Sequence, residues 1–135
     1  MPKSCIADSG ALVALLDPRE EHHRWARETF ARQPGPWFTC EAALTEAFFL
    51  SHELHAHTLD KLLRQGHLRI GLNLADELLQ VLDLRAKYAN VPMSLADACL
   101  VRMSETLPDP IVVTTDADFK SYRRHSRQVV PCLLP

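Results

Sequence analysis

Short apolar segments that suit β-strands alternate along the chain with longer segments that suit helices. Proline and glycine mark the breaks, as at Asp17-Pro18, at residues 33–36 and at Val91-Pro92. Because strands and helices alternate, the pattern predicts a parallel sheet with helices packed on it. We expect strands at residues 3–7, 37–39, 67–72, 111–114 and 128–134. We expect helices at residues 9–16, 20–32, 41–53, 57–65, 74–88 and 94–107, and a turn or short helix at 116–122.

With 135 residues the chain is long enough for one hydrophobic core, and we expect a single domain over residues 1–135. The start of the chain lacks a cationic flank followed by a long apolar run, so we expect no signal peptide. Widely spaced cysteines in apolar surroundings are expected to be free thiols of a cytoplasmic protein rather than disulfides or zinc ligands. These cysteines are Cys5, Cys40, Cys99 and Cys132.

Four acidic residues lie inside or at the end of apolar segments, where an isolated ionised carboxylate costs several kcal/mol or more to bury. Two of them, Asp8 and Asp116, follow predicted strands, and ligands of parallel sheets bind beyond the carboxyl ends of the strands. A shared divalent cation explains all four placements, and hard carboxylate oxygens suit magnesium or manganese. The four residues are Asp8, Glu46, Asp97 and Asp116.

Each aspartate also has a purely structural explanation. Asp8 is placed to cap the following helix, which Ser9 also suits, and Asp116 lies in a strand-to-helix turn that favours aspartate. Asp97 follows Ser94 by three residues, which is the spacing of a capping box. Capping and a functional role are compatible, because one carboxylate can serve both.

Glu46 has apolar neighbours three and four residues away in its predicted helix, so we expect it within or beside the buried stripe. Glu41 is the competing candidate, but it lies in the first helical turn, where the helix dipole favours a carboxylate without any function. We therefore prefer Glu46. Asp118 adds a carboxylate two residues after Asp116, as a metal ligand or as a capping residue, and the sequence leaves this open.

The chain carries 17 acidic and 15 basic residues; without the four carboxylates and Asp118 the acidic residues number 12, fewer than the basic ones. That balance suits an acidic site for an anionic polymer within a mildly cationic surface. Residues 123–127 form a basic run. Such a run is usually a solvated turn and less often binds the phosphates of a nucleic-acid backbone. The histidines of residues 52–57 do not form the H-E-x-x-H zinc pattern and are expected at a solvated helix end.

Four motifs stand in an order that is similar to a known family, the PIN-domain proteins of the VapC toxin type. The resemblance spans essentially the whole chain and implies a three-layer α/β/α sandwich with a central five-stranded parallel sheet. It also implies an endoribonuclease that depends on Mg²⁺ or Mn²⁺. The motifs are Asp8-Ser9-Gly10-Ala11-Leu12, the helical Glu46, Ser94-Leu95-Ala96-Asp97-Ala98 and Thr114-Thr115-Asp116-Ala117-Asp118-Phe119.

The resemblance assigns roles to individual residues. The four carboxylates would be both catalytic and metal-binding, and Asp118 would be the frequent fifth ligand. Thr114 would be the hydroxyl residue that orients a carboxylate or a ligand water. Proteins of this type form homodimers and are neutralised by an antitoxin whose segment covers the acidic groove, so both partners are expected here beside an RNA substrate.

The leading hypothesis is a metal-dependent endoribonuclease, the toxin of a toxin–antitoxin pair, with Arg102 or Arg123 touching phosphates. The alternative is a catalytically silent PIN-like module that binds RNA or protein. A phosphatase with an aspartyl-phosphate intermediate would place a second aspartate where this chain has Gly10, and a receiver domain would place one near residues 71–73. Both are disfavoured.

Overall fold

The computed structural model describes residues 3–135, so Met1 and Pro2, part of the start expected to lack a signal peptide, lie outside the described residues. Five parallel strands form one sheet in the order β3-β2-β1-β4-β7. This confirms the predicted parallel sheet. The strands are β1 (Ser4–Ala7), β2 (Trp37–Thr39), β3 (Leu68–Ile70), β4 (Pro110–Val113) and β7 (Cys132–Leu133).

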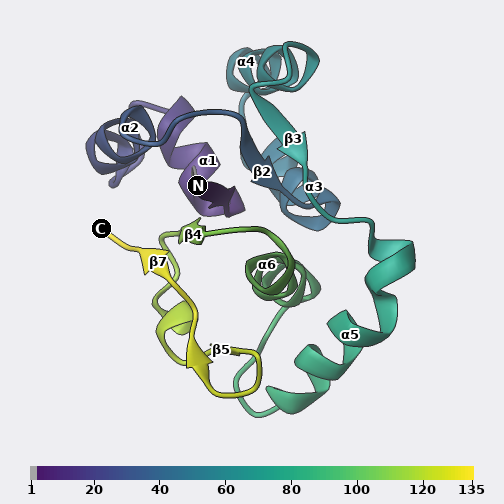
Figure 1. The fold of residues 1–135 in the computed structure, drawn as a ribbon. Helices are drawn as coiled ribbons and strands as arrows, with labels where there is room; N and C mark the ends of the chain where they lie inside the picture. Colours follow the sequence, from purple (N-terminus) through teal and green to yellow (C-terminus); the bar gives the residue numbers. More distant parts are fainter. Residues whose placement is uncertain (1–2) are drawn as a thin grey trace.

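Helices connect the strands and cover both faces of the sheet, and the fold is a PIN-like α/β/α sandwich (Figure 1). The pairs α1 with α2 and α5 with α6 lie on opposite sides of the sheet. The helices are α1 (Ser9–Leu16), α2 (His23–Ala31), α3 (Glu41–Leu50), α4 (Glu53–Arg64), α5 (Leu74–Lys87), α6 (Leu95–Thr106) and the 3₁₀ helix η1 (Ala117–Lys120).

Successive side chains of the central strand β1 point to opposite faces of the sheet, and each face is covered by its own layer of helices. Ile6 of β1 packs in the cluster that contains residues of α5 and α6, whereas its neighbours Cys5 and Ala7 pack with α1, α2 and α4. All four residues of β1 are buried, as expected for a strand with a helix layer on each face. Cys5, Cys40 and Cys99 are buried free thiols and Cys132 is half-buried, which confirms the expectation of free cysteines.

The predicted last strand, residues 128–134, is wrong as one element. Gln128–Val129 forms β6, which pairs antiparallel with β5 (Arg123–Arg124) in a separate hairpin. Pro131 lacks a backbone N–H and ends this ladder. Its carbonyl accepts from the N–H of Val112 at 2.9 Å, so the chain joins β4 before β7 begins.

Two predicted helix boundaries also differ. The helix expected over residues 41–53 ends at Leu50, because Ser51 takes an extended backbone and donates its hydroxyl to the carbonyl of Ala47 at 2.7 Å. α4 then begins at Glu53, earlier than the predicted residue 57.

The second helix starts at His23 rather than residue 20. The carboxylate of Asp17 accepts from the N–H of Arg19 at 2.9 Å and holds this segment in a turn. Within the helix, Ala26 and Phe30 are buried and Trp25 is half-buried. Along residues 3–135, no helix combines the length and the apolar character needed to cross a bilayer.

Candidate active site

A pocket of about 340 Å³ lies where β1 and β4 end and where α1 and α6 begin. The four carboxylates singled out from the sequence all line it, although they are spread from residue 8 to residue 116. The topology explains this, because β1 and β4 are parallel neighbours whose carboxyl ends meet at one edge. The lining residues are Asp8, Ser9, Gly10, Glu46, Leu50, Pro92, Ser94, Asp97, Thr115 and Asp116.

Asp8 is buried and held by hydrogen bonds at both carboxylate oxygens. Oδ1 accepts from the backbone N–H of Ser9 at 2.7 Å, so Asp8 rather than Ser9 is the N-cap of α1. Oδ2 accepts from the hydroxyl of Thr114, also at 2.7 Å. Burial raises the pKa of Asp8 to about 6 and the charge of Asp97 adds to the rise, although the hydrogen bond from Thr114 opposes it. The capping role is therefore real, and it coexists with a position in the pocket.

Thr114 connects two of the aspartates. Its hydroxyl donates to Asp8 and accepts from the backbone N–H of Asp116 at 3.0 Å. Asp116 is half-buried and caps η1, because its Oδ1 accepts from the N–H of Asp118 at 2.9 Å. The side chain of Asp118 is exposed and is not part of the pocket lining. Only its backbone N–H takes part in the cap of η1, so the capping role considered for its carboxylate is not observed.

Asp97 is also buried, in the first turn of α6. Ser94 is the N-cap, and its hydroxyl accepts from the N–H of Asp97 at 3.0 Å, which confirms the capping interaction predicted from the spacing. The hydroxyl of Tyr122 donates to Asp97 Oδ2 at 2.9 Å. Burial raises the pKa of Asp97, the hydrogen bond from Tyr122 lowers it and the charge of Asp116 raises it further. Tyr122 was missed from the sequence, where only its position after an aromatic, acidic turn could have drawn attention to it.

Glu46 reaches the pocket from α3, and of the two positions expected for it, within or beside the buried stripe, it takes the one beside the stripe. Its side chain is exposed, and so are its helical neighbours Phe49 and Leu50. The core side of α3 is formed instead by Ala43 and Ala47, which are buried. Glu46 therefore stands at the rim of the pocket. The competitor Glu41 is exposed in the first turn of α3 and does not belong to the described lining.

Comparison with known families agrees with this geometry. Residues 5–125 match the PIN domain. The chain belongs to the PIN-domain family. No curated protein matches the chain. PIN domains are in general nucleases that bind nucleic acid, so the family supports hydrolysis of nucleic acid as the class of reaction.

PIN nucleases usually use divalent metals, and the donor chemistry of the pocket fits such an ion. Its four acidic side chains offer hard oxygens, and burying Asp8 beside Asp97 and Asp116 builds up the negative charge that a cation would relieve. Within residues 3–135, however, no three His, Cys, Asp or Glu side chains are arranged to hold one metal ion.

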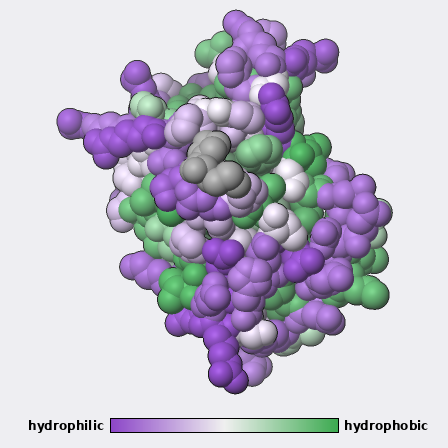
Figure 2. Space-filling view, in the orientation of Figure 1, coloured by the Kyte–Doolittle hydropathy of each residue, from purple (hydrophilic) through white to green (hydrophobic). Residues whose placement is uncertain are grey.

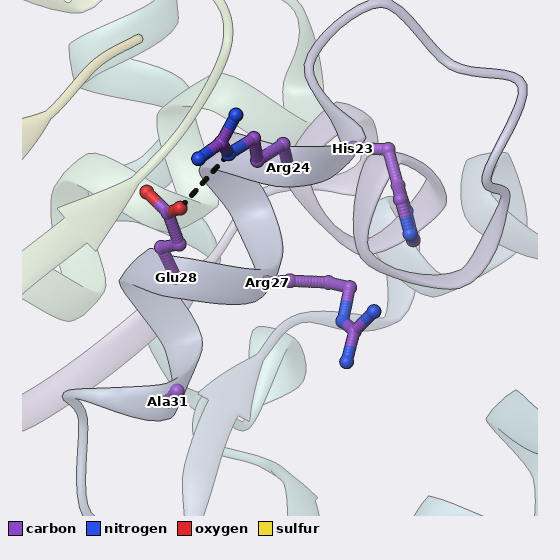
Figure 3. A pocket seen from close by; sticks show the side chains of 5 residues that line it. All are labelled: His23, Arg24, Arg27, Glu28 and Ala31. Carbon is purple, nitrogen blue, oxygen red and sulfur yellow. Dashed lines mark hydrogen bonds and ion pairs between the residues drawn. The ribbon is translucent and has the colours of Figure 1, made fainter.

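Another depression, of about 430 Å³, lies on α2 and is lined by His23, Arg24, Arg27, Glu28 and Ala31. Figure 3 shows Arg24 turned towards Glu28, to which it donates at 3.1 Å, and Arg27 pointing away. All of its lining residues belong to one exposed helix, so it is a surface hollow rather than a site assembled from several elements.

The two arginines expected to touch phosphates are engaged within the protein. Arg102 is paired with Glu77 at 2.7 Å and with Glu105 at 3.1 Å. Arg123 donates to the backbone carbonyls of Lys120 and Tyr122. Arg102 thus joins α6 to α5 and Arg123 holds the turn after η1, and the expected phosphate contact receives no support from these positions.

Proposed function

We propose that this PIN-domain protein is a metal-dependent endoribonuclease that hydrolyses phosphodiester bonds in RNA with Mg²⁺ or Mn²⁺. In this proposal Asp8, Glu46, Asp97 and Asp116 are the catalytic and metal-binding residues, and Asp118, whose exposed side chain lies outside the pocket lining, is an additional metal ligand. The main support for the proposal is that the four carboxylates line one pocket at the carboxyl edge of a parallel sheet.

A divalent cation bound there would supply charge neutralisation at phosphorus and a more acidic water. The protein prepares the ligands. Thr114 and Ser9 hold the carboxylate of Asp8, and Tyr122 and Ser94 hold Asp97, so both buried groups keep a fixed orientation. Glu46 stands exposed at the rim, where a long side chain can reach water or the scissile phosphate.

Cleavage of a single-stranded RNA in Mn²⁺ tests this proposal. Wild-type protein should produce metal-dependent fragments, and Asp97→Asn, which preserves the side-chain volume, should lose them while its circular dichroism spectrum stays that of a folded protein. Undiminished cleavage by a folded Asp97→Asn protein would contradict the role of the quartet.

The competing proposal is a catalytically silent PIN-like module that binds RNA or protein. It is favoured by the finding that no three candidate ligands, in the described part of the chain, are arranged around one ion. The same experiment separates the two functions, because a silent module retains RNA in a mobility-shift assay and yields no metal-dependent product.

We further propose that the protein is the cytoplasmic toxin of a toxin–antitoxin pair, a homodimer built from one domain over residues 1–135. Large apolar side chains that are exposed support the binding of protein partners. Among the described residues, most of these side chains, including the three most exposed, lie on α3, α4 and α5. Phe49 is 86% exposed, Leu54 74% and Leu79 72%. Figure 2 shows hydrophobic residues exposed among hydrophilic ones on the side of the molecule where α5 lies.

A further inference from the structure

We propose that Tyr122 is a positioning residue for the metal site, because its hydroxyl fixes the carboxylate of Asp97. This inference rests on the proposed nuclease function and adds a residue that lies behind the pocket rather than in its lining. The donor–acceptor distance is 2.9 Å, and the two residues are 25 positions apart in the chain.

The direction of this hydrogen bond is determined by the chemistry of its two groups. The phenol of Tyr122 carries an O–H and an ionised carboxylate can only accept, so the hydroxyl donates to Asp97 Oδ2. Tyr122 is fully buried, and it contacts Oδ2 from the core side. Asp97 nevertheless lines the pocket, which leaves Oδ1 as the oxygen for a ligand there.

Two other aromatic rings prevent the phenol from turning away. The ring of Tyr122 packs edge-to-face against Tyr88 at 5.2 Å and against Phe119 at 5.1 Å. The hydroxyl of Tyr88 accepts from the N–H of Arg123 at 2.8 Å and contacts neither carboxylate, so it is the ring of Tyr88 that restrains the phenol. A buried hydroxyl in a packed aromatic cluster orients its acceptor far better than an exposed one would.

The arrangement at Asp97 parallels the one at Asp8. Each buried carboxylate accepts one hydroxyl hydrogen bond from the segment that follows β4, Asp8 from Thr114 and Asp97 from Tyr122. The segment from Thr114 to Tyr122 thus holds both carboxylates. Residues that orient metal ligands in this way change metal affinity by about 10- to 100-fold when their hydrogen bond is removed.

Tyr122→Phe removes the hydroxyl and retains the ring, and Tyr88→Phe makes the same change on the neighbouring ring without touching a carboxylate. Mn²⁺ affinity, measured by calorimetric titration, should fall about tenfold or more in Tyr122→Phe. Cleavage by this variant should recover at saturating Mn²⁺, and Tyr88→Phe should keep the wild-type affinity. Equal affinity in Tyr122→Phe and wild type, or equal losses in the two variants, would overturn the positioning role.

A measurement on the unsubstituted chain covers the case in which Tyr122→Phe does not fold. The protein has 2 tyrosines, so labelling with 3-fluorotyrosine gives two ¹⁹F resonances, which Tyr88→Phe assigns. Titration with diamagnetic Mg²⁺ should shift the Tyr122 resonance with the midpoint of metal binding, and an unmoved resonance would overturn the proposal. Mn²⁺ binding that Asp8→Asn leaves unchanged would instead overturn the proposed function, and the positioning role with it.

Discussion

Thr114 donates its hydroxyl to Asp8 at 2.7 Å, although 106 positions separate the two residues in the chain. The bond joins the ends of β1 and β4, two parallel neighbours in the sheet, and the same hydroxyl accepts from the backbone N–H of Asp116. One buried side chain therefore holds the carboxylate of Asp8 and the backbone of Asp116, two of the residues proposed to act on RNA.

Replacing Thr114 with valine removes this link at nearly constant volume. The variant should lose about 1–3 kcal/mol of unfolding free energy, because the buried carboxylate of Asp8 loses a partner and so does the N–H of Asp116. Urea denaturation measures the loss, with Thr115→Val, the same change at the next and half-buried position, as the control. Equal stability of wild type and Thr114→Val would show that the hydrogen bond is dispensable.

The raised pKa of Asp8 predicts a pH dependence of stability in metal-free buffer. Its pKa rises from the ordinary 3.8 to about 6 in the folded protein, so the folded state binds the proton more tightly than the unfolded state. The stabilising contribution is fully present below the unfolded pKa and is lost as the pH rises through the folded pKa. Asp8→Asn lacks this loss. The melting temperature of Asp8→Asn minus that of the wild type should therefore increase between pH 4 and pH 7. A constant difference would contradict the raised pKa of the buried Asp8.

Arg102 is predicted to stabilise the fold rather than to bind RNA. Arg102→Ala leaves Glu77 and Glu105 without their partner and should cost on the order of 1–2 kcal/mol of unfolding free energy. The Michaelis constant for RNA should stay unchanged. The exposed Arg127, changed to alanine, should alter stability by less than about 0.5 kcal/mol. A rise in the Michaelis constant without loss of stability would restore the phosphate contact expected from the sequence.

The exposed apolar side chains of α3 and α5 are predicted to serve association. Phe49→Ser and Leu79→Ser should change the unfolding free energy by less than about 0.5 kcal/mol, because both residues are already largely exposed. At least one of them should shift the sedimentation of the protein towards the monomer. Val129→Ser changes an equally apolar residue on the β5–β6 hairpin, 62% exposed, and should leave sedimentation unaltered. Identical sedimentation of all three variants and wild type would contradict a dimer through these helices.

The sequence was sufficient for the parts of the site that follow strands. Asp8 and Asp116 could be placed because a parallel sheet brings its carboxyl ends to one edge. Asp97 was selected because it lies inside an apolar segment, whereas the spacing from Ser94 predicted only its capping interaction. Glu46 could be placed only within or beside the buried stripe, since apolar neighbours along a helix do not reveal that this side of α3 stays exposed. Tyr122 was missed because its contact with Asp97 depends on how the segment after β4 folds back onto α6, which no local pattern encodes.

The division of the predicted last strand was missed for the same reason, because it also depends on contacts between distant segments. Residues 128–134 are suited to strands on both sides of Pro131, and local propensity alone does not distinguish a hairpin strand from an edge strand of the main sheet. Pro131 was the available signal, because a residue without an N–H interrupts a ladder.

The most direct test of a shared metal site is the melting temperature of wild type and Asp8→Asn with and without Mn²⁺. An ion at one hundred times its dissociation constant stabilises the native state by about 2.7 kcal/mol through mass action. The wild-type melting temperature should therefore rise by several degrees, and that of Asp8→Asn should rise much less. An equal rise in the two proteins would place the metal elsewhere and contradict the proposed site.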